Sequence, residues 1–353
     1  MKKIFLSAFF VLYLFGIELH IPDSLVFQHP EKLSYEDLTK PLSLEEKITL
    51  ELLLAIKEHR HKDEELLASL LRKTDIPKNP FDNILLAPPG QWSIVVEKSK
   101  QRLYVVNGTK IHKLPCITGK KPGDKLKQGD QKTPDGIYFP KTFIAPKSLT
   151  PIYGEGAFPL NYPNIIDKKI HHKTGNGIWL HATNDDNRKP FSSNGCVVVT
   201  NEIFTSIKPI IKLKETPVIV VDNVDPIDPE SFYKERLSLG YFIYRWKKAW
   251  EGSVNGKYKR YMDFYSDRLI CTYGDKKAFM AHKKAIAQNK KWIKIDIEDL
   301  YLAKDGRLLD FGHLYVASFK LAYDSNNYKW SGRKILYIIK KDGQWKILAE
   351  ENL

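Results

Sequence analysis

Cysteine is scarce in this sequence: the 353 residues include only Cys116, Cys196 and Cys271. An odd number of thiols excludes a disulfide scaffold, because at least one cysteine must stay unpaired within the chain. Long apolar runs are also scarce. The run at residues 4–17 is shorter than the roughly 20 residues that a membrane-spanning helix needs. We therefore expect the rest of the chain to fold as a soluble protein.

The first residues have the composition of an export signal. Lys2 and Lys3 precede the apolar run, which is the order found in secretory signal peptides. Only Gly16 offers a small residue for cleavage, so removal of the signal and retention as a weak anchor both stay open. We expect residues 1–18 to direct the protein to the periplasm, free or attached to the inner membrane by the N-terminus alone.

Positive charge dominates the composition. The 56 Lys and Arg residues against 42 Asp and Glu residues leave a net charge of +14. Such a surface attracts polyanions, including nucleic acid, acidic lipid and anionic wall polymer. With an export signal, no nucleic-acid partner is expected. Solubility alone is an equal explanation of the charge.

The region after the signal, residues 19–88, is predicted to be a helical N-terminal element. Apolar residues recur at spacings of three and four within residues 32–73, and Ser43 with Glu46 matches a helix-capping box. We expect these helices to pack within the chain. A homodimer formed through them is the alternative.

Two further domains follow, and together they predict an α+β multidomain fold. Residues 89–223 alternate like strands and carry a tight hairpin turn at Asn107 and Gly108. The absence of alternating long helices there disfavours a doubly wound parallel sheet. In residues 224–353, one long aromatic-rich helix is predicted over 231–267. The strands predicted after it cover residues 291–306, 313–325 and 333–351.

The candidate chemistry centres on Cys196, in the stretch FSSNGCVVVTNE. Cysteine catalysis needs a thiolate, a base and donors for an oxyanion. His181 ends an apolar stretch fifteen residues upstream, and a polar loop of that length can bring its imidazole beside the thiol. Gly195 permits a sharp turn that aims backbone N–H groups at a carbonyl. By spacing alone, a buried structural cysteine stays open as the alternative.

The motif SSNGC resembles the Ser/Thr-His/Asn-Gly-Cys signature of the L,D-transpeptidase catalytic family, which has the YkuD-like fold. The hairpin that starts at Trp92, the segment KTPDGIYFP and the strand GIWLHAT resemble other parts of that family. The resemblance implies a β-sandwich with a short helix. It also implies that Cys196 is the nucleophile, that His181 is the base and that the Ala182 carbonyl holds the imidazole.

The surroundings of the nucleophile both follow and depart from that family. The predicted oxyanion and substrate contacts are Trp179, Arg188, Ser193, Asn194 and Gly195. Arg188 is the candidate partner of a substrate carboxylate, with a solvated loop charge as the alternative. Asn194 stands where the family usually has histidine, and Val198 where it often has arginine. These departures bear on how a substrate carboxylate and an acceptor amine are held.

The segment RWKKAWEGSVNGKYKRYMDFYSD and the closing DGQWKIL resemble a nuclear-transport-factor-2-like cone. Helical element, catalytic domain and cone together resemble the cell-shape-determining L,D-carboxypeptidases of helical bacteria. By that analogy we expect an enzyme that trims terminal D-alanine from stem tetrapeptides of peptidoglycan, through a Cys196 acyl-enzyme. The alternatives are an L,D-transpeptidase that cross-links two diamino acids and a non-catalytic wall-binding scaffold.

No cofactor or metal is expected. His171 and His172 are consecutive and would point to opposite faces of a strand, and no acidic or cysteine partner completes a zinc set with His181. Residues 119–130 lack the phosphate-loop pattern and are predicted to form a flexible loop near the cleft. Cys116 and Cys271 fit small buried residues.

Overall fold

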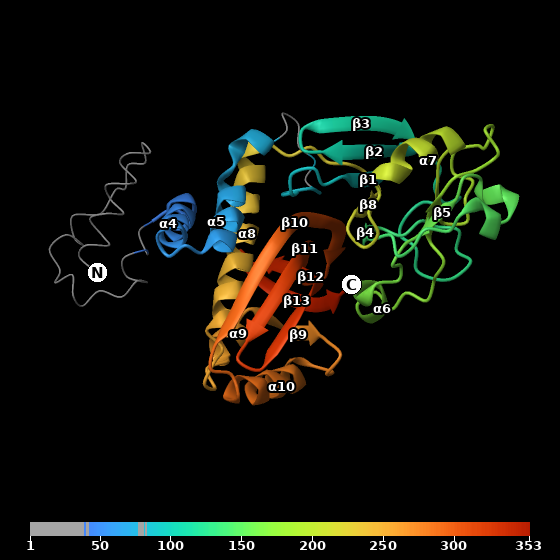
Figure 1. The fold of residues 1–353 in the computed structure, drawn as a ribbon. Helices are drawn as coiled ribbons and strands as arrows, with labels where there is room; N and C mark the ends of the chain where they lie inside the picture. Colours follow the sequence, from blue (N-terminus) through green and yellow to red (C-terminus); the bar gives the residue numbers. More distant parts are fainter. Residues whose placement is uncertain (1–38, 40–41, 77–80, 82) are drawn as a thin grey trace, which may run out of the picture.

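The computed structural model describes residues 39, 42–76, 81 and 83–353 (Figure 1). The predicted signal at residues 1–18 lies outside these ranges. Within them, no helix combines the length and apolar character that crossing a membrane requires. The fold is α+β, with a helical N-terminal element, a β-rich middle domain and a C-terminal domain of helices and one sheet.

In the part of the N-terminal element that the structure describes, the predicted helices are α4 (Leu44–Lys57) and α5 (His61–Leu71). The predicted capping box is confirmed. The Ser43 side chain accepts the Glu46 N–H, and the Glu46 carboxylate accepts the Ser43 N–H. The helices separate at His59, whose φ of 53° lies in the left-handed region that no α-helix contains.

The C-terminal domain begins with α8 (Pro229–Glu251), on which α4 and α5 pack. The predicted helix over 231–267 is wrong in its second half, because α8 ends at Gly252. Asn255 and Gly256 follow with φ values of 50° and 79°, a left-handed backbone that stops a helix. The elements after this turn are α9 (Lys259–Met262), β9 (Tyr265–Ile270) and α10 (Lys276–Gln288), of which the patterns above did not indicate α10.

The strands predicted in the C-terminal domain are confirmed as one sheet. They are β10 (Ile293–Leu309), β11 (Gly312–Ser325), β12 (Tyr328–Lys341) and β13 (Gln344–Asn352). The sheet order is β10-β11-β12-β13-β9, and β9 runs parallel to β13. Side chains of α5, α8 and α10 pack on one face of this sheet in a continuous apolar core.

The middle domain contains two sheets. The larger has the order β3-β2-β1-β8-β4 and consists of β1 (Ser93–Glu97), β2 (Arg102–Asn107), β3 (Lys110–Pro115), β4 (Gly136–Tyr138) and β8 (Val218–Val221). The smaller consists of β5 (Ala157–Pro159), β6 (Trp179–His181) and β7 (Val197–Val198). Its helices are α6 (Ile165–Lys169) and α7 (Asn201–Ile207). The predicted turn between β2 and β3 is confirmed by the pairing of Asn107 with Lys110 and a φ of 56° at Gly108.

The middle and C-terminal domains share an apolar core. Val95, Ile137 and Ile219 of the larger sheet pack in one cluster with Tyr301 and Val316 of the C-terminal sheet. The C-terminal sheet therefore has helices on one face and the middle domain on the other, as Figure 1 shows for β1, β8 and β4 beside β10 to β13. This contact fixes the middle domain relative to the C-terminal domain.

Candidate active site

The smaller sheet brings the strand that ends at His181 beside the strand that follows Cys196. Strands β6 and β7 are parallel, with Leu180 opposite Val197 and His181 opposite Val198. Leu180 and Val197 point into the apolar core of the middle domain, so alternation directs His181 and Val198 to the other face. Cys196 lies in the turn that directly precedes β7. The strand pairing thus places the backbone of the two candidate residues at neighbouring strands.

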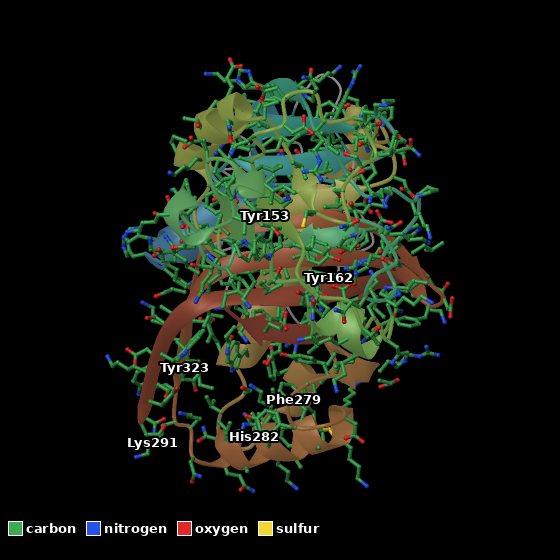
Figure 2. All side chains as sticks on the ribbon, turned by 90° about the vertical axis from the view of Figure 1, so that its right-hand side faces the viewer. Tyr153, Tyr162, Phe279, His282, Lys291 and Tyr323 are labelled. Atoms are coloured by element: carbon green, nitrogen blue, oxygen red, sulfur yellow. The ribbon has the colours of Figure 1, made fainter. Side chains whose placement is uncertain are left out.

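The His181 ring is held by two contacts. Its Nδ1 lies 2.6 Å from the Ala182 carbonyl oxygen, the contact that the family resemblance implies. A carbonyl only accepts, so Nδ1 carries the proton and Nε2 keeps the lone pair that a base needs. The Tyr153 ring packs edge-on against the imidazole at 4.9 Å and also contacts Trp179 at 5.1 Å. Figure 2 shows Tyr153 in the middle domain, far from Phe279 and His282 of the C-terminal domain.

The Cys196 thiol is half-buried at the end of its turn. Its Sγ lies 3.6 Å from the Gly177 carbonyl oxygen, to which it donates. In the part of the chain that the structure describes, no hydrogen bond joins Cys196 Sγ to the His181 ring. Catalytic hydrogen bonds are often long or poorly aligned without substrate, so this arrangement is compatible with a reactive pair.

Both groups are uncharged at neutral pH. Burial lowers the pKa of His181 to about 4, against the Ala182 hydrogen bond that raises it, and the charge of Arg188 lowers it further. Burial also raises the pKa of the Cys196 thiol, against the Trp179 backbone and the charges of Arg188 and Lys125. The pair therefore starts as thiol and neutral imidazole, and the thiol must give up its proton as it attacks.

Comparisons with known proteins identify the middle and C-terminal domains. A family model described as the L,D-transpeptidase catalytic domain matches residues 91–220, and one described as the Cds6 C-terminal NTF2-like domain matches residues 238–351. The structure of Bd1075 from Bdellovibrio bacteriovorus is 32% identical, with a TM-score of 0.63, over 78% of this chain and 98% of that chain. This chain belongs to the YkuD L,D-transpeptidase family.

The family consists of cell-wall enzymes that act on peptidoglycan peptides. Pgp2 of Campylobacter jejuni, described as a helical cell shape determining protein, is similar over 80% of this chain and all of that chain. Its identity is 28% and its TM-score 0.59. No curated protein sequence matches the chain.

In this L,D-transpeptidase-family chain, hydrogen bonds within the turn before Cys196 hold its shape. The Gly195 N–H donates to Ser193 Oγ at 3.1 Å, and Ser193 Oγ donates to the Cys196 carbonyl oxygen at 2.7 Å. Ser193 is buried, so its side chain shapes the turn. Since these bonds occupy the Gly195 N–H, the Cys196 N–H is the candidate oxyanion donor of the turn.

Two other predicted contacts have hydrogen bonds of their own. Asn194 is exposed, and its Oδ1 accepts a hydrogen bond from Lys120 Nζ at 3.2 Å. Arg188 is half-buried and donates from Nε to Ser192 Oγ at 3.2 Å. The charge of Arg188 lowers the pKa of both His181 and Cys196.

Residues 119–130, predicted as a flexible loop, are bonded together through Asp130. Asp130 accepts from Lys125 Nζ at 2.7 Å and from the backbone N–H groups of Leu126, Lys127 and Lys132 at 2.8–3.1 Å. Burial opposes the charge of Asp130, but these donors lower its pKa well below its usual range. These bonds give the loop a defined shape beside the turn at Gly195.

Sequence reasoning did not find Tyr153, Gly177 or Lys125, which contact or influence the pair from distant loops. No motif marks them. His171 and His172 lie in a bend after α6, not on a strand. The described residues contain no group of three or more His, Cys, Asp or Glu side chains that could hold a metal ion.

Proposed function

We propose that this chain is a cysteine-dependent L,D-carboxypeptidase that removes the terminal D-alanine from stem tetrapeptides of periplasmic peptidoglycan. The observation that carries the proposal is the position of Cys196 directly before β7, which pairs with the strand that ends at His181, whose Nδ1 is held by Ala182. Similarity to Pgp2, described as a helical cell shape determining protein, along the whole length of that protein supports a role in cell shape.

The first half of the cycle forms an acyl-enzyme. Nε2 of His181 takes the thiol proton while Sγ of Cys196 attacks the carbonyl carbon at the L-centre of the diamino acid. The oxyanion forms near the Cys196 N–H. When the tetrahedral intermediate collapses, the C–N bond breaks and the imidazolium gives its proton to the amine of the leaving D-alanine.

The second half releases a tripeptide. A water molecule gives a proton to His181 and attacks the thioester carbon, the C–S bond breaks, and the proton returns to the sulfur. In a transpeptidase, an amine of a second stem peptide replaces this water. That reaction needs a second ordered site, whose occupation costs lost translational and rotational freedom. Loop 121–135 closes one side of the nucleophile turn, which favours water.

The test uses purified disaccharide tetrapeptide at high concentration, with products resolved by mass. Tripeptide and free D-alanine as the main products support the proposal. Dimers joined between two diamino acids, if they exceed tripeptide, would establish the transpeptidase instead. A protein that binds the wall but releases no D-alanine would be the non-catalytic scaffold.

A further inference from the structure

Loop 121–135 touches the residue that precedes the nucleophile. A Cβ placed on Gly195 would lie 2.7 Å from the carbonyl oxygen of Lys132, so only glycine fits there. The Gly119 N–H donates to Thr133 Oγ1 at 2.9 Å, which closes the base of the loop. The loop is therefore packed against the turn that positions Cys196.

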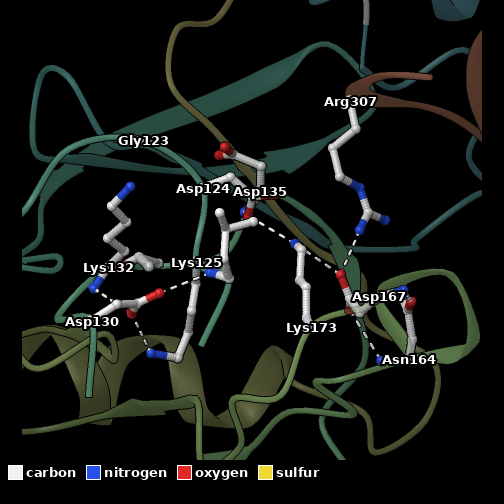
Figure 3. Close-up of polar contacts among 12 residues, drawn as sticks. Gly123, Asp124, Lys125, Asp130, Lys132, Asp135, Asn164, Asp167, Lys173 and Arg307 are labelled. Carbon is white, nitrogen blue, oxygen red and sulfur yellow. Dashed lines mark hydrogen bonds and ion pairs between the residues drawn. The ribbon is translucent and has the colours of Figure 1, made fainter. Parts of the chain in front are cut away.

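Four buried or half-buried charged groups connect this loop to the C-terminal domain (Figure 3). Arg307 of β10 donates from Nη1 to Asp167 Oδ1 at 2.6 Å. Lys173 Nζ lies 2.9 Å from the same Asp167 oxygen and 2.8 Å from Oδ1 of Asp124, which belongs to the loop. We call Arg307, Asp167, Lys173 and Asp124 the ionic relay.

The Arg307 side chain is enclosed by groups of its own strand and of the middle domain. Asp305 holds its guanidinium with two bonds of 2.7 Å, and Asp305 also accepts the Ile137 N–H of β4 at 3.2 Å. A Cβ on Gly136 would lie 2.8 Å from the guanidinium carbon. Arg307, Asp167 and Lys173 are each at most 6% exposed, so removing one leaves its partner as an uncompensated buried charge.

A second connection reaches the thiol along the backbone. After Lys173, the Thr174 N–H donates to the Leu126 carbonyl of the loop at 3.1 Å. The chain continues to Gly177, whose carbonyl accepts from Cys196 Sγ. Lys173 is thus connected to the surroundings of Cys196 in two ways. One runs through Asp124 into loop 121–135, and the other runs along the backbone from Thr174 to Gly177.

We infer that Arg307 is a positioning residue: through the ionic relay, the C-terminal domain holds loop 121–135 in the place that the reaction at Cys196 requires. The inference rests on the proposed function for its kinetic consequence. A buried ion pair is either formed or broken. The packed loop passes the resulting change in its position on to the turn at Gly195. The C-terminal domain then contributes to catalysis, in addition to covering the apolar face of the larger sheet.

The test compares Arg307→Leu with Arg333→Leu in the full chain. Arg333 is an equally buried arginine of the C-terminal domain that also reaches the middle domain, at Glu215 over 3.5 Å, but it does not contact the loop. Lys173→Met breaks the ionic relay from within the middle domain, and Arg307→Lys keeps the charge while losing the forked geometry. The readouts are amide hydrogen exchange of residues 121–135, alkylation of Cys196 by iodoacetamide, and kcat and KM for tetrapeptide.

We expect Arg307→Leu and Lys173→Met to raise loop exchange by about tenfold or more relative to Arg333→Leu, because a loop freed of its anchor opens locally. Alkylation of Cys196 should accelerate in the same two variants. A displaced loop 121–135 should lower kcat by about 10–100-fold with a smaller change in KM. Arg307→Lys should keep part of the activity that Arg307→Leu loses.

A folded Arg307→Leu protein whose loop exchange and alkylation match those of Arg333→Leu would overturn the inference. If Arg307→Leu does not fold, Lys173→Met decides in the same way. Exchange and alkylation need no substrate. A wild-type protein that releases no D-alanine would therefore remove the proposed function and leave the ionic relay to be judged on these two readouts.

Discussion

At the scale of single residues, the three cysteines have different surroundings. Cys116 is buried, and burial raises the pKa of its thiol to about 12. Cys271 is half-buried in the C-terminal domain. Cys196 is half-buried as well, and it directly precedes β7, which pairs with the strand that ends at His181. The strand pairing therefore relates Cys196 to the candidate base.

Alanine substitution of each cysteine should therefore distinguish Cys196 from Cys116 and Cys271 by its effect on activity. We expect Cys196→Ala to lower D-alanine release by on the order of 10³-fold or more, since no other group can form the thioester. Cys116→Ala and Cys271→Ala should keep the activity of each folded molecule. Release is measured on tetrapeptide, with circular dichroism as the control for folding. A well-folded Cys196→Ala protein with undiminished release would refute the enzymatic assignment.

The low pKa of His181 predicts the acid limb of activity. The base must be neutral, and burial lowers its pKa to about 4, so the neutral ring persists as pH falls through 6.5. We expect kcat/KM to hold down to about pH 5 and to halve near pH 4, provided that fluorescence shows a folded protein. A half-loss near pH 6.5, the ordinary value for histidine, would contradict the buried neutral ring.

At the scale of elements, α5 and α8 pack most closely at Gly240. A Cβ on this glycine would lie 2.2 Å from Leu70 Cδ2, and the Leu70 Cδ1 and Cγ atoms are within 3.0 Å. Glycine inside a helix normally costs about 0.5–1 kcal/mol relative to alanine. Its presence in α8 is explained by the approach of the Leu70 side chain, which a Cβ at this position would have to displace.

Gly240→Ala should consequently destabilise the protein instead of stabilising it. We expect a loss of about 1–3 kcal/mol in the free energy of unfolding by urea, as for overpacking in a core. Gly252→Ala is the matched control at the end of the same helix, where the nearest atoms to a Cβ lie at 3.5 and 3.6 Å. A Gly240→Ala protein more stable than wild type would show that α5 does not press on α8.

At the scale of the whole molecule, the middle and C-terminal domains are parts of one packed unit. The cluster of Val95, Ile137 and Ile219 with Tyr301 and Val316 crosses the boundary between them. The buried hydrogen bond between Ser93 Oγ and Tyr301 Oη, at 3.0 Å, crosses it too. Removing the C-terminal domain would expose an apolar face of the larger sheet to water.

We therefore predict that these two domains unfold together. Scanning calorimetry of the full chain should show one main transition for them, and a chain truncated after residue 223 should aggregate or melt at a lower temperature. Each apolar side chain that loses its cover forfeits about 1.5–3 kcal/mol. A soluble truncated protein with the melting temperature of the full chain would contradict the shared core.

Local patterns in the sequence were sufficient for much of this protein. The capping box at Ser43, the turn at Gly108 and the strands of the C-terminal sheet depend on neighbours within a few residues, and the structure contains them all. The family of the middle domain could also be predicted from the sequence, because the resemblance rests on motifs such as SSNGC and GIWLHAT, whose residues are adjacent in the chain. The helix break near Asn255 was missed because the amphipathic pattern outweighed a turn signal inside it.

Only the tertiary structure decided what surrounds the reactive pair. Arg307 and Asp167 are 140 residues apart in sequence, and no periodicity or motif relates two groups that meet across a domain boundary. The low pKa of His181 likewise comes from burial, which depends on loops far along the chain. Sequence by itself identified the candidate nucleophile and base, because those roles depend on residue type. Their protonation state and the wall beside them depend on packing, because desolvation and ion pairing exist only once the chain has folded.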